Sequence, residues 1–306
     1  MKIAKKPAVM RVLITGGTGF VGRVVQEEWP DVVLWPASAD LTDRQAVAQA
    51  VGSLLSQGVD AVLHLAAQSN PAQSLDSPLA TWTVNLMGTV HLLEELASRA
   101  WCGSFLLASS GAVYGRVTGR IDENSPVFPS TPYAASKLAA ELAVLEWAQR
   151  TKNRGLIARP FNHSGAGQAI SYFLPSMAQQ MVSLPPTGGE IEVGNLKVHR
   201  DFSHVRDIVR GYRLLLERGE SGQIYNLAGG RSRLLSEVLD RMAEIAGREV
   251  SWVVRAERFR EEDPRPIEID LRKMREYTGW RPESPLDTLL KDLLNDWTKR
   301  RCQNQH

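Results

Sequence analysis

Tyr133 and Lys137 are the residues of this sequence best suited to moving a proton. They stand four positions apart at the start of a predicted helix, so their side chains share one helix face. A free tyrosine has a pKa of about 10 and is a poor acid near neutral pH. A neighbouring ammonium group stabilises the phenolate and moves the group into a useful range. The spacing predicts a general acid–base pair; the alternative is a helix-start tyrosine followed by a surface lysine.

Two serines follow an apolar segment that is predicted to be a buried strand. Ser109 and Ser110 come directly after residues 104–108. The carboxyl ends of parallel strands form the edge at which such sheets bind ligands. A serine hydroxyl there can hold the carbonyl or alcohol oxygen of a substrate during hydride transfer.

A glycine-rich turn lies near the start of the chain. Gly16, Gly19 and Gly22 are spaced G-x-x-G-x-x-G, after a predicted strand at 11–15 and at the opening of a predicted helix at 19–28. Glycine permits a tight turn and a close approach of the backbone to a pyrophosphate, which the positive end of the helix then binds. The strand before the turn and the helix after it favour a dinucleotide site over a glycine turn that binds nothing.

Predicted strands and helices alternate through the first half of the chain and so position these residues. The strands are expected at 11–15, 32–35, 61–65, 104–108 and 156–159, and the helices at 19–28, 44–57, 85–99 and 133–150. The alternation predicts an α/β fold, a Rossmann-type doubly wound parallel sheet.

The pattern becomes irregular after Arg159, where glycine and proline cluster. A strand at 223–227 is expected to rejoin the sheet, and helices are expected at 234–246 and 285–298. We therefore predict two domains, of which the second is the smaller. They are a dinucleotide-binding domain, residues 1–160 plus about 205–228, and a C-terminal substrate-binding domain, residues 161–204 and 229–306.

Composition bounds the remaining possibilities. The 306 residues are 43% hydrophobic and 23% charged, with a net charge of +2 and basic residues spread along the chain, so no nucleic-acid partner is expected. No apolar run approaches the ~20 residues that cross a bilayer, and no membrane association is expected. Cys102 and Cys302 are the only cysteines and have no metal or redox spacing. A cytoplasmic location is the expectation.

Several motifs occur in a shared order along the chain. They are His64-Leu65-Ala66-Ala67, Asn85, Ser109–Gly115, Pro132-Tyr133 and Arg159–Asn162. With the glycine turn, they make the chain resemble the extended short-chain dehydrogenases/reductases over nearly its full length. The resemblance implies that Asn85 supports the proton path, that Ser110, Tyr133 and Lys137 form the catalytic set, and that Asn162 touches a substrate diphosphate. It implies cofactor contacts from Gly16, Gly19, Phe20, Val21, Gly22, Arg23, Asp40, Leu41, Leu65, Ala66, Ala67, Lys137 and Pro160.

The cofactor implied is NADP(H) or NAD(H). Asp40 and Leu41, expected at the end of a third strand, match the acidic–aliphatic pair that lies along the adenine in this superfamily. No Asp or Glu ends the strand at 32–35, where a carboxylate would bind the ribose hydroxyl of NAD. NADP(H) is therefore slightly favoured, with Arg23 as a phosphate partner or, alternatively, an ordinary solvated helix residue.

A narrower resemblance concerns the substrate. Residues 161–168, FNHSGAGQ, and the segment from Val193 to Asp207 resemble the GDP-6-deoxy-D-mannose reductases. The two resemblances together imply a nucleotide-sugar substrate, GDP-linked by preference, that contacts Ser110, Tyr133, Asn162, Asn195, Arg200 and Arg260. Arginine suits a diphosphate because its fork offers several donors. Arg200 and Arg260 could instead form surface salt bridges, and the FREED motif around Arg260 departs from the usual RPxE form.

One position separates possible reactions. GDP-mannose 4,6-dehydratases carry a glutamate where this chain has Ala112, after Gly111, and neither residue here can move a proton. We therefore predict reduction of the 4-keto group of a GDP-4-keto-6-deoxyhexose, giving a GDP-rhamnose-type product. The alternatives are a nucleotide-sugar 4-epimerase and a non-catalytic NAD(P)-sensing scaffold.

Two further expectations concern metals and assembly. His199, Asp201 and His204 cluster, but without a recognisable ligand spacing, so ordinary hydrogen-bonded histidines are favoured and no metal is expected. The helices at 85–99 and 133–150 carry wide apolar faces, as in family dimers that pack two helices from each subunit. A homodimer is therefore expected.

Overall fold

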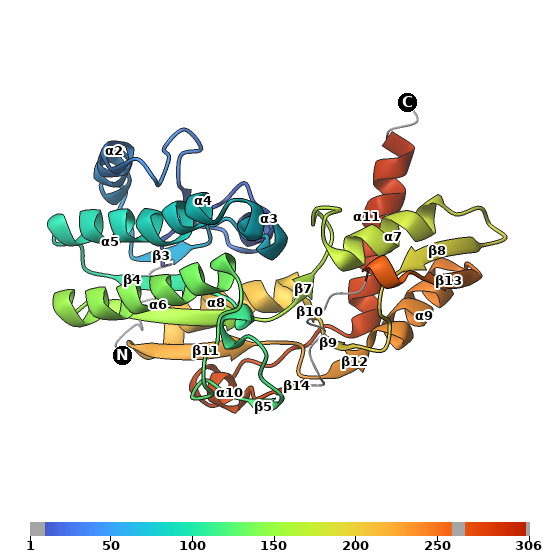
Figure 1. Ribbon diagram of the computed structural model, residues 1–306. Helices are drawn as coiled ribbons and strands as arrows, with labels where there is room; N and C mark the ends of the chain where they lie inside the picture. The colour runs from blue at the N-terminus through green and yellow to red at the C-terminus, as the bar shows by residue number, and fades with distance from the viewer. Residues whose placement is uncertain (1–9, 259–266, 304–306) are drawn as a thin grey trace, which may run out of the picture. The chain divides into compact units, whose positions relative to one another are not determined.

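The computed structural model describes residues 10–258 and 267–303, and its chain divides into two compact units. Unit 1 contains the described residues up to Val113, together with Pro129–Arg159 and Gly211–Tyr225. Unit 2 contains Tyr114–Phe128, Pro160–Arg210 and the described residues from Asn226 onward. Figure 1 labels many of the elements of both units.

A six-stranded sheet forms the centre of unit 1, in the order β11-β6-β4-β3-β1-β2. The strands are β1 (Val12–Thr15), β2 (Val32–Leu34), β3 (Ala61–His64), β4 (Ser104–Ala108), β6 (Arg154–Pro160) and β11 (Gln223–Leu227). The ladders joining β1, β2, β3, β4 and β6 are parallel. The predicted α/β fold with a doubly wound parallel sheet is confirmed, and β4 and β11 lie where the sequence predicted them.

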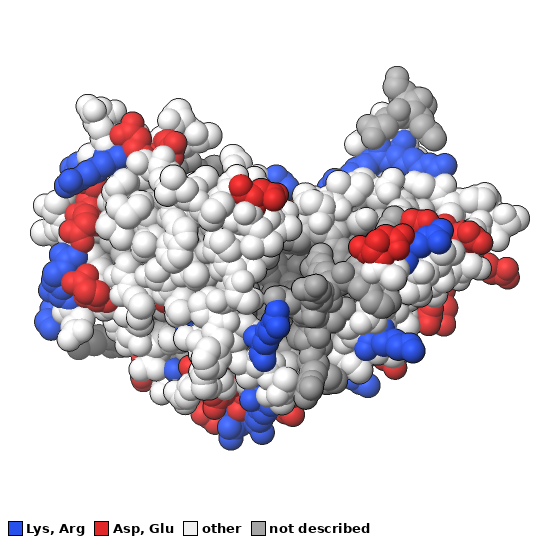
Figure 2. All heavy atoms as spheres, viewed as in Figure 1, with Lys and Arg blue, Asp and Glu red and all other residues white. Residues whose placement is uncertain are grey.

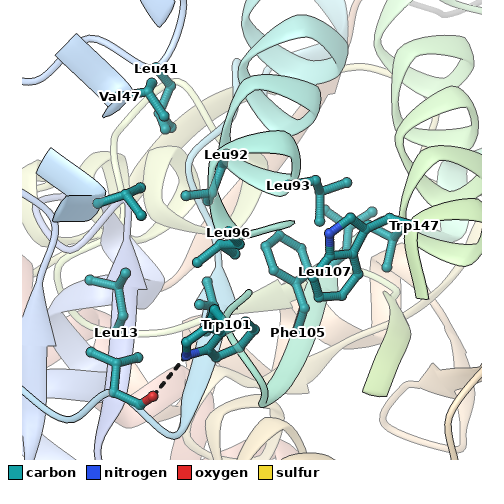
Figure 3. Packing of buried hydrophobic residues seen from close by; sticks show 14 of the residues in the cluster. Leu13, Leu41, Val47, Leu92, Leu93, Leu96, Trp101, Phe105, Leu107 and Trp147 are labelled. Atoms are coloured by element: carbon teal, nitrogen blue, oxygen red, sulfur yellow. Dashed lines mark hydrogen bonds between the residues drawn. The ribbon is translucent and has the colours of Figure 1, made fainter. Parts of the chain in front are cut away.

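Helices cover this sheet because its strands are apolar on both faces. The helices of unit 1 and its border are α1 (Phe20–Glu28), α2 (Arg44–Leu55), α3 (Pro71–Asp76), α4 (Pro78–Trp82), α5 (Gly88–Ser98), α6 (Pro132–Thr151) and α8 (Val205–Arg218). Helices α2, α5 and α6 bury their apolar residues in one cluster with β1, β3, β4 and β6. Figure 3 shows Phe105 of β4 beside Trp147 of α6, with ring centroids 5.7 Å apart.

One expectation about unit 1 is confirmed over most of its length by α5, and a second is wrong. The helix expected at 85–99 is preceded and partly replaced by a π-helical segment, η1 (Thr83–Met87), between α4 and α5. No third strand precedes Asp40, since residues 35–43 form turns. The cause is local: the amide of Ala39 bonds to the carbonyl of Pro36, and the Asp40 carboxylate accepts the amide of Thr42 at 2.8 Å.

Unit 2 has short paired strands and its own apolar core. Its elements include the 3-10 helix η3 (Ala256–Arg258), the helices α7 (Phe173–Ser183), α9 (Leu235–Ala246), α10 (Arg272–Thr278) and α11 (Leu286–Gln303), and the strand pairs β5 (Gly119–Ile121) with β14 (Ile267–Ile269), β7 (His163–Ser164) with β10 (Ser203–His204), β8 (Gly189–Val193) with β13 (Val250–Val254), and β9 (His199–Asp201) with β12 (Ser232–Leu234). Helices α7, α9 and α11 pack with β8 in one buried cluster. Unit 2 therefore has a hydrophobic core separate from that of unit 1.

Charged side chains are unevenly distributed over the face shown in Figure 2. In Figure 2 the area over α5 and α6 is largely uncharged, and basic and acidic side chains alternate along its margin. Within residues 10–258 and 267–303, no helix combines the length and the apolar character needed to span a membrane.

Candidate active site

The glycine loop lies where the loops after β1 and β3 meet. A Cβ atom on Gly16, whose φ is +72°, would lie 2.7 Å from the amide nitrogen of Ala66. A Cβ on Gly22 would lie 2.3 Å from the carbonyl oxygen of Gly16. Side chains are therefore excluded at both positions. β1 and β3 are neighbours while β2 lies on the other side of β1, so this edge is the topological switch point at which such sheets bind dinucleotides.

The start of α1 fits a pyrophosphate. Gly19 is the N-cap and forms no side-chain capping hydrogen bond, and the first turn, which begins with Phe20 and Val21, contains no acidic residue. The positive end of a helix that follows a glycine loop is a favourable place for an anion. Arg23 lies one turn further along and donates from Nη1 to the carbonyl of Thr18 at 2.7 Å, which places its guanidinium beside the glycine loop.

The pair expected along the adenine follows a turn instead of a strand. Asp40 is exposed, and hydrogen bonds from the backbone and then the hydroxyl of Thr42 lower the pKa of its carboxyl group. Leu41 is buried in the core cluster with α2 and α5, and its carbonyl lies 3.0 Å from Nδ1 of His91. Leu41 thus has a clear packing role, while the Asp40 carboxylate stays accessible.

The loop after β3 is fixed to the loop after β1. The amide of Ala66 donates to Oγ1 of Thr15 at 3.2 Å, and the amide of Leu65 donates to the carbonyl of Thr15. Leu65 and Ala66 therefore lie beside Gly16, and Ala67 follows them in the same loop.

Tyr133 and Lys137 begin α6, which the hydroxyl of Thr131 caps by accepting the amide of Ala134 at 3.2 Å. Both side chains are buried, Tyr133 at 8% exposure and Lys137 at 4%. Nζ of Lys137 donates to the carbonyl of Ala108 at 2.8 Å, which ties α6 to the end of β4. Burial lowers the pKa of the Lys137 ammonium to about 8, and the carboxylate of Glu141 opposes that shift.

Asn85, predicted to support the proton path, and Ser110, the third member of the predicted catalytic set, are connected to the same place. Asn85, 2% exposed in the π-helical segment η1, donates from Nδ2 to Oγ of Ser136 at 2.9 Å. Ser136 in turn donates to the carbonyl of Tyr133 at 2.9 Å. Ser110 follows β4 and accepts the amide of Ala112 at 3.1 Å. The structure thus gathers Asn85, Ser110, Tyr133 and Lys137 at the carboxyl edge of β4.

A buried ion pair lies next to this site and was not predicted from the sequence. Glu141 and Arg159 are 1% and 4% exposed and form two hydrogen bonds, at 2.6 and 2.9 Å. Ser109 Oγ donates to the same carboxylate in a short contact. The available signal was a charged residue four positions after Lys137 and an arginine at the end of an apolar strand. Opposite charges buried in one core are expected to pair.

The residues expected to touch the substrate diphosphate belong to unit 2. Asn162 follows Pro160, the buried last residue of β6, and its Nδ2 lies 3.4 Å from the carbonyl of Asp201. Arg200 precedes that aspartate on β9 and donates from Nη1 to the carbonyl of His199 at 2.9 Å. Asn195 instead caps a local turn by accepting the amide of Lys197 at 3.0 Å. Arg260 lies outside the described residues.

The histidine cluster has other partners. The Asp201 carboxylate accepts the amide of Gly229 at 2.6 Å, and burial raises its pKa despite such bonds from the loop. His204 Nε2 lies 3.1 Å from Oδ2 of Asp292 rather than facing Asp201. Within the described ranges, no group of three or more His, Cys, Asp or Glu residues is arranged to hold a metal ion.

Fold and site together define a class: enzymes of the extended short-chain dehydrogenase/reductase type, which use NAD(H) or NADP(H). The chain belongs to the NAD dependent epimerase/dehydratase family, whose model matches residues 12–228.

Individual relatives agree with this membership. The chain is 35% identical over 302 residues to "GDP-6-deoxy-D-mannose reductase" of Pseudomonas aeruginosa, which covers 95% of this chain and 98% of that one. It is 26% identical to "UDP-glucose 4-epimerase" of Corynebacterium glutamicum, covering 92% and 94%. Among solved structures, that of RMD from Pseudomonas aeruginosa complexed with NADPH superposes with a TM-score of 0.85 at 34% identity, covering 95% and 99%.

Proposed function

We propose that this enzyme reduces the 4-keto group of a GDP-4-keto-6-deoxyhexose to the corresponding GDP-6-deoxyhexose, a GDP-rhamnose-type product. The observation that carries the proposal is the 35% identity to a GDP-6-deoxy-D-mannose reductase across nearly the whole of both chains. Members of one family that act on different sugars share the fold, so the site must supply the rest of the argument.

The roles of the buried side chains follow from their chemistry. Bound reduced nicotinamide dinucleotide supplies the hydride. Tyr133 donates the proton to the sugar oxygen, and the charge of Lys137 favours the phenolate that remains. Ser110 orients the same oxygen, and Asn85 fixes the start of α6 through Ser136.

The loop after β4 argues against dehydration as the reaction. Gly111 and Ala112 open a 3-10 turn, and neither has a group that can transfer a proton. Elimination of water from a GDP-hexose needs such a group next to the sugar. This favours a reductase, which receives its substrate already dehydrated.

Unit 2 supports a diphosphate partner. Arg200 on β9 stands directly opposite Arg233 on β12 in an antiparallel ladder. The forks of these two arginines offer several donors that suit the oxygens of a diphosphate. We therefore propose that residues 161–204 and 229–306 bind the nucleotide sugar and that residues 1–160 with about 205–228 bind the dinucleotide.

NADP(H) is the proposed cofactor. Leu34 ends β2 and turn residues follow it, so no carboxylate stands where NAD would place its ribose hydroxyl. Arg23, held beside the glycine loop, is the proposed partner of the additional phosphate. A relative of known structure is complexed with NADPH.

We also propose a homodimer. Large apolar side chains are exposed on adjoining segments: Leu79 of α4 at 78%, Met87 of η1 at 43% and Leu142 of α6 at 62%. Figure 2 shows little charge over α5 and α6. Such a surface is typical of an interface, here one that packs the same helices of two copies together. Cys102 and Cys302 are unpaired, which suits the reducing cytoplasm we propose as the location.

The experiment supplies the 4-keto-6-deoxy product of a GDP-mannose 4,6-dehydratase together with NADPH. A reductase consumes one equivalent of reduced cofactor per sugar, and GDP-mannose alone stays unchanged. Conversion of GDP-mannose without the dehydratase would overturn the argument from Ala112. Sugar inversion with no loss of NADPH would establish the epimerase alternative, to which the epimerase relative points. Cofactor binding without turnover on any nucleotide sugar would favour a scaffold.

A further inference from the structure

A chain of buried hydrogen bonds runs through unit 1 from the end of β1 towards α6. Oγ1 of Thr15 lies 2.7 Å from Nδ1 of His64, and Nε2 of the same ring lies 3.0 Å from Oγ1 of Thr89. Thr89 donates to the carbonyl of Asn85 at 2.6 Å. All four residues are at most 2% exposed, so no solvent competes for these bonds.

The chain continues through the side chain of Asn85. Its Oδ1 accepts the amide of Gln68 at 2.8 Å, and its Nδ2 donates to the Gln68 carbonyl at 3.1 Å. The same Nδ2 donates to Ser136, whose hydroxyl donates to the carbonyl of Tyr133. The chain therefore joins the loops that follow β1 and β3 to the first turn of α6.

The direction of each bond can be worked out because a hydroxyl has a single proton. Thr89 gives its proton to the Asn85 carbonyl, so towards His64 it can only accept. Nε2 of His64 must therefore carry a proton. In the neutral ring Nδ1 is then bare and accepts the proton of Thr15, whose oxygen accepts the amide of Ala66 at 3.2 Å.

One tautomer thus satisfies every donor in the chain. A second proton, on Nδ1, would point at the Thr15 hydroxyl. That hydroxyl could then no longer donate to the ring, and its proton would need another acceptor inside the protein core. Burial and then the charge of Lys137 lower the pKa of His64 to about 3, in the same direction. The aromatic neighbour on β4 is Phe105, with ring centroids 5.6 Å apart, which offers no competing acceptor.

We propose that His64 is a neutral positioning residue, held as its Nε2-protonated tautomer, which couples the cofactor-side loops to Asn85 and through it to Tyr133. Its partner Thr89 fixes the carbonyl of Asn85 in the π-helical segment η1 by a hydrogen bond to the residue four positions earlier. The link to catalysis rests on the proposed function, whereas the tautomer does not.

The tautomer is measured directly on the full chain labelled with ¹⁵N-histidine. Long-range proton–nitrogen spectra of the six histidines distinguish protonated from bare ring nitrogens. The His64 signals are those lost in His64→Gln or, should that variant fail to fold, those that shift most in Thr89→Ser. We expect a protonated Nε2 and a bare Nδ1, unchanged between about pH 5 and about pH 8. A protonated Nδ1, or a titration midpoint near 6.5, would overturn the proposal whatever the enzyme reduces.

The coupling is tested by removing one hydroxyl. Thr89→Val should lower kcat by about tenfold, the loss of one hydrogen bond of ordinary strength, while NADPH affinity changes little. Thr89→Ser, which keeps the hydroxyl, should restore most of kcat. Thr81→Val is the control, since Thr81 is equally buried and donates to the Ser77 carbonyl at 3.0 Å outside the chain. Equal kcat values in Thr89→Val and Thr81→Val, or no rescue by serine, would refute the coupling.

Discussion

Replacing Glu141 by glutamine should destabilise unit 1 more than any single substitution of a surface charge. The carboxylate is 1% exposed and serves two partners, the guanidinium of Arg159 and the hydroxyl of Ser109. Glutamine keeps the shape but removes the charge and turns one acceptor into a donor. Arg159, 4% exposed, is then left as a buried cation without its counter-charge.

The size of the effect follows from that burial. Breaking a buried ion pair from one side typically costs about 3–5 kcal/mol. A whole domain is stable by only about 5–15 kcal/mol, so the loss is a large fraction of the total. Replacing both partners, as in Glu141→Leu with Arg159→Met, removes the unpaired charge and should recover most of the loss.

The assay is urea unfolding followed by tryptophan fluorescence, because Trp147 lies on the same helix as Glu141. The matched control is Glu217→Gln, whose partner Arg213 is 3.0 Å away but 39% exposed. We expect the control to lose less than about 1 kcal/mol. Equal losses in Glu141→Gln and Glu217→Gln, or a double variant no more stable than Glu141→Gln, would refute this reasoning.

Three further predictions concern the site itself. Tyr133→Phe should lower turnover by at least ~10²-fold with cofactor binding intact, and near-normal turnover would remove the phenol from the mechanism. Burial lowers the pKa of Lys137 from 10.5 to about 8, so below pH 8 its buried positive charge destabilises the folded state. The free energy of unfolding should rise as the pH increases from about 8 to about 10.5, where the folded chain loses this proton before the unfolded chain does. Lys137→Met should therefore raise Tm at pH 7 while abolishing turnover, and a lowered Tm would contradict this. Arg200→Ala should weaken GDP-sugar binding by about 1.5–3 kcal/mol and leave NADPH affinity unchanged, as measured by calorimetry; the reverse pattern would place Arg200 on the cofactor.

Local signals were sufficient for most of the sheet. β4 is a short, mostly apolar run between Gly103 and Ser109, and it lies where the pattern predicted, as does the strand-like segment β11. The strand expected directly before Asp40 does not form, because Pro36 and Asp40 make turns that outweigh the strand propensity of their neighbours. The π-helical segment at 83–87 could not be foreseen, since the apolar spacing that predicts a helix does not distinguish a π-turn from an α-turn.

In the candidate site, too, contacts between residues close in sequence could be predicted, whereas contacts between distant residues could not. Residues close in sequence, such as Tyr133 and Lys137, could be joined by helical spacing alone. Pairs joined across the fold could not, because nothing local relates Thr15 to His64 or Glu141 to Arg159. Buried polar groups need partners, but the sequence does not say which ones. The partners appeared only when the sheet order was known.

Deuterium transfer tests the central claim most directly. The enzyme would be given GDP-4-keto-6-deoxymannose and an excess of NADPH carrying deuterium at both C4 positions of the nicotinamide. The account predicts one deuterium at C4 of every product hexose, detected by mass spectrometry and located by NMR, with one NADPH oxidised for each. Product hexose without deuterium, or deuterium that never exceeds the amount of enzyme, would contradict net reduction by exchangeable cofactor.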